Sequence, residues 1–249
     1  MMKVEQAMEQ PALRRLVQGL IEALGPRLRS VVLYGSAARG DFHEGTSDLN
    51  VLLVLEDLDP ATLETLSPSV ARWCAKGHHA PRLFSPALIA ESADVFPIEF
   101  LDIRAGRLVL HGDDPFARLE VRGASLRLQC ERELREKMMR LREGYVECHA
   151  RARDLSWLLT DSYTSFLALF RGCLRLLGGE PPAGSREVVA AFCERAGLDQ
   201  APFEEVARLK RGDSAGADLK SIFSRYYEQL TKAVRTVDRF HHAQGGAAR

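Results

Sequence analysis

The stretch that decides the fold runs from Val31 to Leu55 and reads VVLYGSAARGDFHEGTSDLNVLLVL. Two apolar runs rich in β-branched residues enclose a Gly-Ser turn and a polar segment. This pattern predicts two strands, with a turn into a short helix between them. Gly35 allows the backbone to turn sharply because it has no Cβ. The second run begins at Asp48 and is then continuously apolar, which is typical of a central strand covered on both faces.

Outward from this stretch, strands and helices are expected to alternate up to about residue 115. Helices are expected over 5–24, for roughly 18 residues from Asp59-Pro60, and from Ser85-Pro86, because an Asp or Ser cap followed by Pro favours a helix start. Strands are expected over 82–85 and over 97–103, and 106–111 is either a further strand or a turn. This alternation indicates a mixed α/β sheet.

The pattern changes near Gly123, after which the chain is helical with almost no strand signal. Apolar residues recur at helical spacing from Leu126 to Tyr145, and again, more strongly, from Leu155 to Leu177. Further helices with short connections indicate an antiparallel bundle. We therefore expect an α/β (α+β) domain over 1–118 and an all-α helical bundle over 119–249. The boundary should fall between Pro115 and Gly123.

Composition excludes several classes of protein. The chain has 249 residues and a formal net charge of zero, so no global field attracts nucleic acid or an acidic membrane. Its five cysteines are scattered without C-x-x-C spacing, which favours a reducing cytoplasm of bacterial type. The apolar stretches are too short for a membrane-spanning helix. Nucleic acid and membrane are therefore not expected as partners, whereas a homodimer stays open.

Polar residues at the predicted strand ends form a candidate site. Side chains alternate along a strand, so Asp48 and Asn50 should point to one face, beside the Gly-Ser turn. Ser36 and the backbone N–H groups at the following helix start suit a phosphate. Glu99 lies between apolar neighbours in the predicted strand 97–103, where it could project into a polar notch. A triphosphate, a hard divalent cation and a few oxygen ligands fit this set.

The spacing resembles that of the DNA polymerase β-type nucleotidyltransferase superfamily. The signature of that superfamily is Gly-Ser followed by Asp-x-Asp, with a third acid on a later strand. The matching residues are Gly35-Ser36-Ala37-Ala38-Arg39-Gly40 and Ser47-Asp48-Leu49-Asn50. The chain is similar to the minimal or antitoxin-like members and to the aminoglycoside nucleotidyltransferases. The latter also carry a helical domain after the catalytic one.

The resemblance implies a nucleotidyltransferase fold and a role for each matching residue. Gly35 and Ser36 would hold the nucleotide phosphates, and Arg39 and Ser47 would also bind nucleotide. Asp48 would ligate the metal, Asn50 takes the place of the second metal-binding acid, and Glu99 matches the third acid, as a ligand or as the base. The implied cofactor is Mg²⁺, as one or two ions, and the implied donor is an NTP, with ATP expected. The acceptor is a small molecule or a protein. Arg39 is equally ordinary as a solvated residue.

The chain departs from the Asp-x-Asp signature at Asn50. An asparagine there keeps a neutral carbonyl oxygen but removes one negative charge. Loss of one charge-stabilising group in a transfer site commonly costs on the order of 10²–10³ in rate. Two hypotheses follow. Either the chain is a nucleotidyltransferase with impaired activity, or it is a degenerate nucleotide-binding or antitoxin-like interaction protein. Asp102 is not expected to compensate, because three residues beyond Glu99 on a strand it would point to the opposite face.

Overall fold

The computed structural model describes residues 3–39, 49–148, 151–213 and 216–245. By its internal contacts the chain divides into two compact units, Met1–Val121 and Arg122–Arg249. The expected Asp48 and Ser47 lie outside the described residues, as does the polar loop from Gly40.

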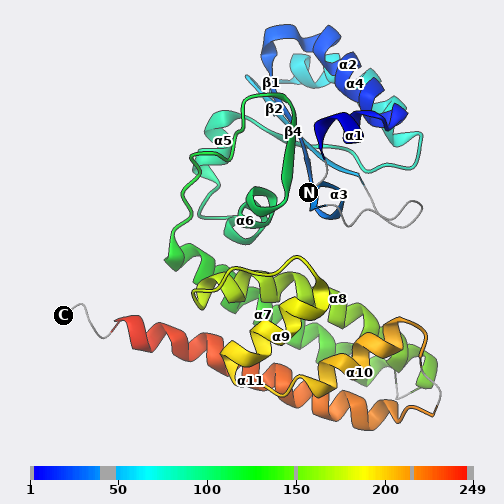
Figure 1. The fold of residues 1–249 in the computed structure, drawn as a ribbon, viewed down its shortest axis with the longest axis vertical. Coiled ribbons are helices and arrows are strands. Elements are labelled where there is room, and N and C mark those ends of the chain that lie inside the picture. The colour runs from blue at the N-terminus through cyan, green and yellow to red at the C-terminus, as the bar shows by residue number, and fades with distance from the viewer. Residues whose placement is uncertain (1–2, 40–48, 149–150, 214–215, 246–249) are drawn as a thin grey trace. The chain divides into compact units, whose positions relative to one another are not determined.

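The first unit contains a mixed sheet, as the sequence predicts. Its strands are β1 (Leu28–Tyr34), β2 (Asn50–Leu55), β3 (Arg82–Phe84) and β4 (Arg107–Gly112). Their order is β3-β2-β1-β4 (Figure 1). β1 pairs antiparallel with both β2 and β4, and β2 pairs parallel with β3. The uncertain stretch 106–111 therefore belongs to an edge strand rather than a turn.

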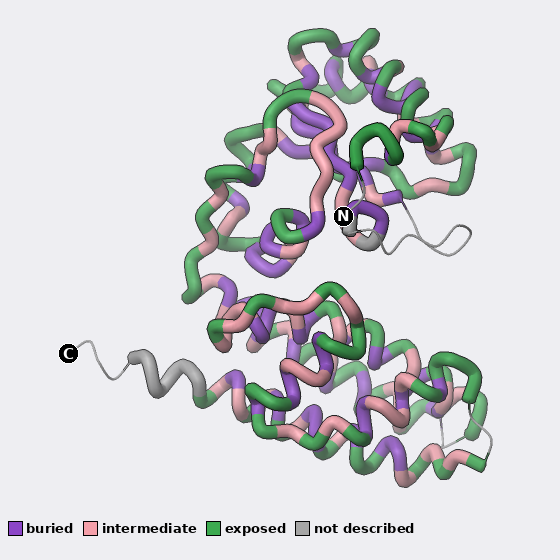
Figure 2. Tube along the Cα trace, in the orientation of Figure 1, coloured by how far each residue is buried: buried purple, intermediate pink, exposed green. Residues whose placement is uncertain are grey.

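Helices cover both faces of this sheet. In chain order they are α1 (Val4–Met8), α2 (Pro11–Leu24), the 3₁₀ turn η1 (Gly25–Arg27), α3 (Ser36–Arg39), α4 (Pro60–Cys74), α5 (Pro86–Glu91) and α6 (Pro97–Ala105). The side chains of α2 and α4 share one core with Val31 and Leu33 of β1. Those of α5 and α6 share the other core with Val32. Figure 2 shows the central strands β1 and β2 as mostly buried, so the prediction of a strand covered on both faces is confirmed for β2.

The predicted cap-and-proline helix starts are confirmed. The Asp59 carboxylate accepts a hydrogen bond of 2.7 Å from the Thr62 N–H at the start of α4. The Ser85 hydroxyl accepts one of 3.1 Å from the Leu88 N–H at the start of α5. In contrast, the single helix expected over 5–24 is two helices. Gln10 is extended, with ψ of 111°, because Pro11 disfavours the helical conformation in the residue before it.

The strand expected over 97–103 is wrong, because this segment is the helix α6. Its residues are buried on most sides, so a short helix here shows neither the 3.6-residue nor the 2-residue period in the sequence. The missed signal is Pro97 at the first helical position. The preceding residue is Phe96, which has no capping side chain, so the start lacks the cap that identifies α4 and α5.

The second unit is helical throughout its described residues. Its helices are α7 (Gly123–Glu147), α8 (Ala152–Leu176), α9 (Ser185–Ala196), α10 (Ala201–Lys210) and α11 (Leu219–Gly245). α8 is the central helix, in contact with the other four (Figure 1). Phe170 of α8 stacks on Phe192 of α9 at a centroid distance of 4.2 Å and meets Phe203 of α10 edge-on. The apolar residues that recur from Leu155 to Leu177 in the sequence therefore lie at the centre of this core.

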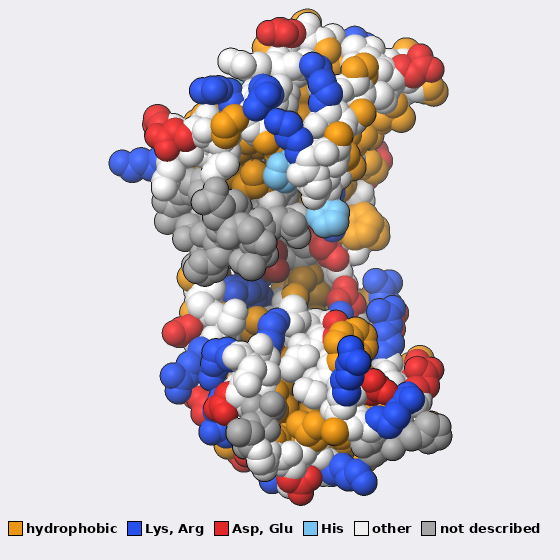
Figure 3. Space-filling view, turned by 90° about the vertical axis from the view of Figure 1, so that its right-hand side faces the viewer, with side chains coloured by type: hydrophobic (Ala, Val, Ile, Leu, Met, Phe, Trp, Pro, Cys, Tyr) orange, Lys and Arg blue, Asp and Glu red, His pale blue; other side chains and the backbone are white. Residues whose placement is uncertain are grey.

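The structure also shows where charged side chains and cysteines lie. On the face drawn in Figure 3, basic and acidic side chains occur over both units. The five cysteines are free of disulfides, and four of them are buried. None of the helices in the described parts of the chain combines the length and the apolar character that a bilayer crossing requires.

Candidate functional site

Three polar residues from adjacent strands form a row at one end of the sheet. Asn50 of β2 pairs with Tyr34 of β1, and Tyr34 pairs on its other side with Arg107 of β4. Val32, Leu52 and Val109 lie two residues along these same strands and belong to the core beneath α5 and α6. Because side chains alternate along a strand, Asn50, Tyr34 and Arg107 share that face.

Gly35 makes the turn that follows this row. Its φ is +83°, a conformation that residues with a Cβ rarely adopt. Its N–H donates a 3.1 Å hydrogen bond to the Gly106 carbonyl, which continues the pairing of β1 with β4. A Cβ built on Gly35 would lie 3.1 Å from Nδ2 of Asn50. The Asn50 side chain therefore lies directly against the glycine turn, as the strand alternation predicts.

The helix α3 starts immediately after this turn, at Ser36, and ends at Arg39. The described part of the chain resumes at Leu49, the residue before Asn50. The described side-chain geometry at this end of the sheet is that of Gly35 and Asn50. The roles in binding phosphate or metal stay predictions for Ser36, Arg39, Ser47 and Asp48.

Glu99 lies on α6, and not on a third strand. Phe100 and Ile103 of α6 pack into the core on the face that carries Asn50. Glu99 is half-buried on the first turn of this helix. Glu99 therefore lies on the helix that covers the face of the sheet carrying Asn50. The direction of its side chain follows from helical geometry and not from strand alternation.

The change from strand to helix also reverses the expectation for Asp102. Residues three apart lie on opposite faces of a strand but on the same side of a helix. Asp102 is half-buried, like Glu99. Both side chains have interaction partners. The strand geometry that set Asp102 aside is therefore wrong, whereas the expectation that Asp102 does not compensate for Asn50 stays a prediction.

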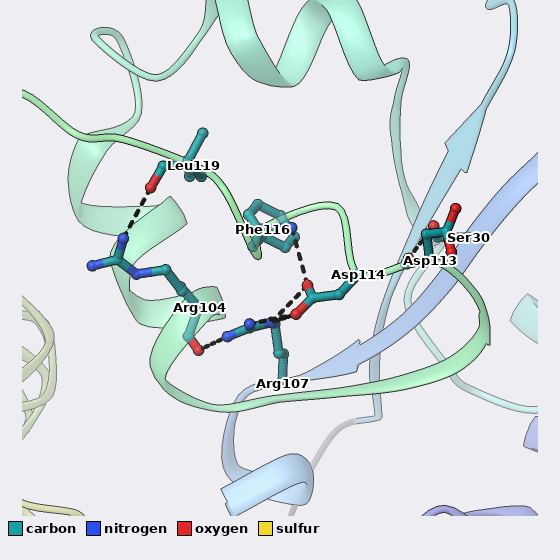
Figure 4. Close-up of polar contacts among 7 residues, drawn as sticks. All are labelled: Ser30, Arg104, Arg107, Asp113, Asp114, Phe116 and Leu119. Atoms are coloured by element: carbon teal, nitrogen blue, oxygen red, sulfur yellow. Dashed lines mark hydrogen bonds and ion pairs between the residues drawn. The ribbon is translucent and has the colours of Figure 1, made fainter.

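Arg107, which the sequence did not single out, is held by the segment after β4. Its Nε donates to both carboxylate oxygens of Asp114, at 2.8 and 3.0 Å (Figure 4). The same carboxylate accepts a hydrogen bond of 3.0 Å from the Phe116 N–H. Hydrogen bonding to Arg107 is the main cause that lowers the pKa of Asp114, opposed by partial burial. A second arginine, Arg104 of α6, donates to the Leu119 carbonyl at 2.9 Å, so the segment is fixed at both ends.

Tyr34, in the middle of the row, is half-buried. Burial raises the pKa of its hydroxyl, and the positive charge of Arg82 opposes this rise. Arg82 belongs to β3 and pairs with Leu52, which lies two residues beyond Asn50 on β2. The described strand ends therefore carry a neutral amide, a neutral phenol and two guanidinium groups. The alternation of side chains along each strand and the register between strands bring these residues together. No local sequence motif indicates that they lie close to one another.

The strands that follow β2 carry no acid in their described residues. β3 reads RLF and β4 reads RLVLHG. The family pattern places a third acid on such a strand, so the chain departs from the pattern there as well as at Asn50. Within the described residues, His, Cys, Asp and Glu side chains do not gather in any group of three or more that could hold a metal ion.

Comparison with known proteins identifies the class of fold. No protein-family model matches the chain, and no curated protein matches its sequence. Among solved structures, the similarity is to a nucleotidyltransferase: the chain has a nucleotidyltransferase-like α/β fold with a C-terminal helical region. The particular neighbour is the spectinomycin adenyltransferase AAD(9) from Enterococcus faecialis, solved with ATP and spectinomycin.

The match to AAD(9) has a TM-score of 0.54 and covers 89% of this chain and 98% of that chain. Sequence identity is 10%, a level at which the likeness establishes the fold and not the activity. The fold expected from the Gly-Ser stretch is thus confirmed, and function has to be argued from the site.

Proposed function

We propose that this chain is a nucleotidyltransferase that transfers a nucleoside monophosphate from an NTP to a hydroxyl group, slowly because Asn50 replaces an acid. The observation that carries the proposal is the contact between Asn50 and the Gly35 turn at the strand ends. The resemblance to the nucleotidyltransferase superfamily implies that the residues at this turn and at the neighbouring strand end would hold nucleotide and metal.

In the proposed reaction the acceptor oxygen attacks the α-phosphorus of the NTP. The bond from that phosphorus to the bridging oxygen breaks, pyrophosphate leaves, and the acceptor proton passes to the Glu99 carboxylate. Gly35, Ser36, Arg39 and Ser47 would hold the phosphates. This role requires the backbone at position 35 to approach the ligand closely, which a glycine permits.

Mg²⁺ would be held by Asp48, Asn50 and Glu99. Two carboxylates and an amide oxygen are hard oxygen donors, which is the set that Mg²⁺ accepts together with water and phosphate. When bound, the ion would neutralise charge on the phosphate oxygens. The Asn50 side chain lies against the turn but contributes no charge, which is the physical reason for expecting slow transfer.

The structural neighbour supports the choice of ligands. AAD(9) was solved with ATP and with spectinomycin. We therefore propose ATP as the donor and a hydroxyl-bearing small molecule as the first acceptor to test, with a protein side chain as the alternative acceptor.

A second candidate is a nucleotide-binding or antitoxin-like interaction protein without transferase activity. Two observations favour it. The described site presents Asn50 instead of an acid, and the described strands β3 and β4 carry arginine but no acid. Arg82, on the face of Asn50, would favour a polyphosphate while providing no metal ligand, whereas Arg107 on the same face is already paired with Asp114.

Nucleotide binding is tested by calorimetric titration of the full chain with ATP in Mg²⁺. Asp48→Ala should weaken binding at least tenfold, about 1.4 kcal/mol. The matched control is Asp57→Ala, an exposed acid beyond the other end of β2, which should bind as the wild type does. If Asp48→Ala and the wild type bind MgATP equally well, both candidates are wrong about this site.

Catalysis is tested by Asn50→Asp. Pyrophosphate release from ATP should be measurable for the wild type with spectinomycin or another hydroxyl-bearing acceptor, and should rise on the order of 10²-fold in the variant. A wild type that binds MgATP but releases no pyrophosphate, together with an active Asn50→Asp variant, supports the second candidate. If both proteins bind MgATP and both are silent, the transfer proposal is wrong.

A further inference from the structure

The helical unit contains a cavity of about 660 Å³ that is lined by residues of α8, α9 and α10. This volume is within the range of sites for small organic ligands. Leu167 of α8 and Val189 of α9 form apolar walls, and the length of α10 closes the third side. The whole lining belongs to the second unit, so this cavity is separate from the strand ends around Asn50.

A buried hydroxyl in this cavity lacks a partner. Tyr163 of α8 lines it and is 7% exposed, yet its hydroxyl has no hydrogen-bond partner in the described part of the chain. A buried polar group without a hydrogen-bond partner destabilises a protein. Burial raises the pKa of this hydroxyl, so near neutral pH it is a neutral donor. A ligand that accepts a hydrogen bond would satisfy it.

The acidic side chains of the cavity are already neutralised. Glu204 accepts from Arg186 at 3.1 Å and from Gln200 at 3.0 Å. Glu205 forms an ion pair of 2.6 Å with Arg225 of α11. The wall formed by α10 therefore has little free negative charge to repel an anion.

Two guanidinium groups in the lining remain without such partners. Arg208 near the end of α10 and Arg211 just after it have no ion pair or side-chain hydrogen bond to any described residue. Both residues are exposed, and both line the cavity: Arg208 from the last turn of α10 and Arg211 from the position after the helix end. Arg211 is close enough to Tyr163 for its charge to oppose the rise in the pKa of that hydroxyl. The two cations and the unsatisfied donor thus lie on the same cavity.

The first turn of α9 adds to this positive field. Ser185 and Arg186, its first two residues, line the cavity, and the preceding Gly184 provides no side-chain cap. The N-terminus of a helix carries a partial positive charge. This contribution is small beside that of two arginines, but it has the same sign.

We propose that this cavity binds a small organic anion. Its carboxylate or phosphate would pair with Arg208 and Arg211 and accept the Tyr163 hydrogen bond, and its apolar body would pack on Leu167 and Val189. The site does not depend on nucleotidyl transfer, because it uses none of the residues at the strand ends. It would give the helical unit a ligand of its own.

The experiment is calorimetric titration of the full chain with phenyl phosphate and with benzoate, with benzyl alcohol as the neutral probe. The wild type should bind at least one anion saturably, more weakly as salt increases, and should not bind the alcohol. The Arg208→Gln, Arg211→Gln double variant should lose about tenfold or more in affinity, because it removes the charged hydrogen-bond donors of the site. Tyr163→Phe, which keeps the ring, should lose several-fold.

The matched control is the Arg140→Gln, Arg235→Gln double variant, which removes two exposed arginines of the same unit that do not line the cavity. It should bind as the wild type does. Unchanged affinity in both the Arg208→Gln, Arg211→Gln variant and Tyr163→Phe overturns the proposal, as does the absence of saturable binding of either anion. Displacement of the probe by MgATP, together with unchanged affinity in those variants, would assign the probe to the strand ends and equally overturn it. Melting curves establish that each variant is folded, and if the double variant is not folded, the affinity of Tyr163→Phe for the anionic probe decides the outcome.

Discussion

Gly35 and Asn50 show how two single residues define the candidate site. The glycine has φ of +83° where β1 turns into α3, and the amide of Asn50 occupies the space that a side chain at position 35 would need. The amide is neutral, whereas the family pattern has a carboxylate there. The same contact therefore supports the location of the site and weakens the case for fast transfer.

At the residue scale we predict that Gly35→Ala loses both stability and MgATP binding. A Cβ at positive φ costs on the order of 1 kcal/mol, and here it would also press on Nδ2 of Asn50. Gly77→Ala is the matched control, because Gly77 has φ of +87° but a Cβ added there would meet no atom within 4 Å. Both variants should unfold at lower urea, but only Gly35→Ala should weaken binding of MgATP in calorimetry. Equal binding by the two variants would contradict a nucleotide site at this turn.

At the element scale, α6 and the segment after β4 organise the face of the sheet that carries Asn50. Phe100 of α6 meets Phe84 of β3 and Phe116 of the following segment edge-on, at centroid distances of 5.5 and 5.6 Å. Asp114 then ties this segment back to Arg107 on β4. Helix, segment and edge strand are thus one packed layer, and the direction of Glu99 depends on it.

The Arg107–Asp114 pair predicts a pH-dependent contribution to stability. The pKa of Asp114 is lowered in the folded protein, so the pair stabilises the fold above the unfolded pKa of about 3.9, and this contribution is lost as the pH falls through the lower folded value. Asp114→Asn should therefore cost about 1 kcal/mol at pH 7, a modest figure because the pair is partly exposed. The difference from the wild type should shrink at pH 3.

Urea unfolding followed by tryptophan fluorescence measures this prediction. Of the two tryptophans, Trp73 is 2% exposed in the core of the first unit and Trp157 is 66% exposed, so the change in emission reports mainly on the first unit. Asp57→Asn, at an exposed acid without a described partner, is the control. An Asp114→Asn deficit that is as large at pH 3 as at pH 7 would show that the charge of Asp114 is not the stabilising feature.

At the scale of the whole molecule, the two units have separate aromatic cores. Phe100 lies in the first and Phe170 in the second, and each is 1% exposed. Every partner ring of Phe100 among the described residues belongs to the first unit, and every such partner ring of Phe170 belongs to the second. Each unit can therefore satisfy its own core without the other.

We predict two transitions in scanning calorimetry, each sensitive to one core. Phe→Ala in a core costs about 3–5 kcal/mol, which for a unit of this size lowers its transition on the order of 10 °C. Phe100→Ala should lower one transition and Phe170→Ala the other. A single transition that both substitutions lower equally would mean that the two units unfold as one.

The sequence alone determined the alternation of strands and helices, the helical character after Gly123, the caps at Asp59 and Ser85, and the substitution at Asn50. These features depend on neighbouring residues, so a local pattern is sufficient to identify them. The Gly-Ser stretch also indicated the class of fold, through its resemblance to the motif of the nucleotidyltransferase superfamily.

Only the tertiary structure decided the rest. It made 97–103 a helix, because burial on most sides hides the period of a short segment and packing on the sheet, rather than propensity, selects its conformation. It brought Arg107 beside Tyr34 and Asn50, because register between strands far apart in the chain determines which side chains meet. It also enclosed Tyr163 in a cavity with Arg208 and Arg211, which three separate helices form and no single stretch of sequence contains.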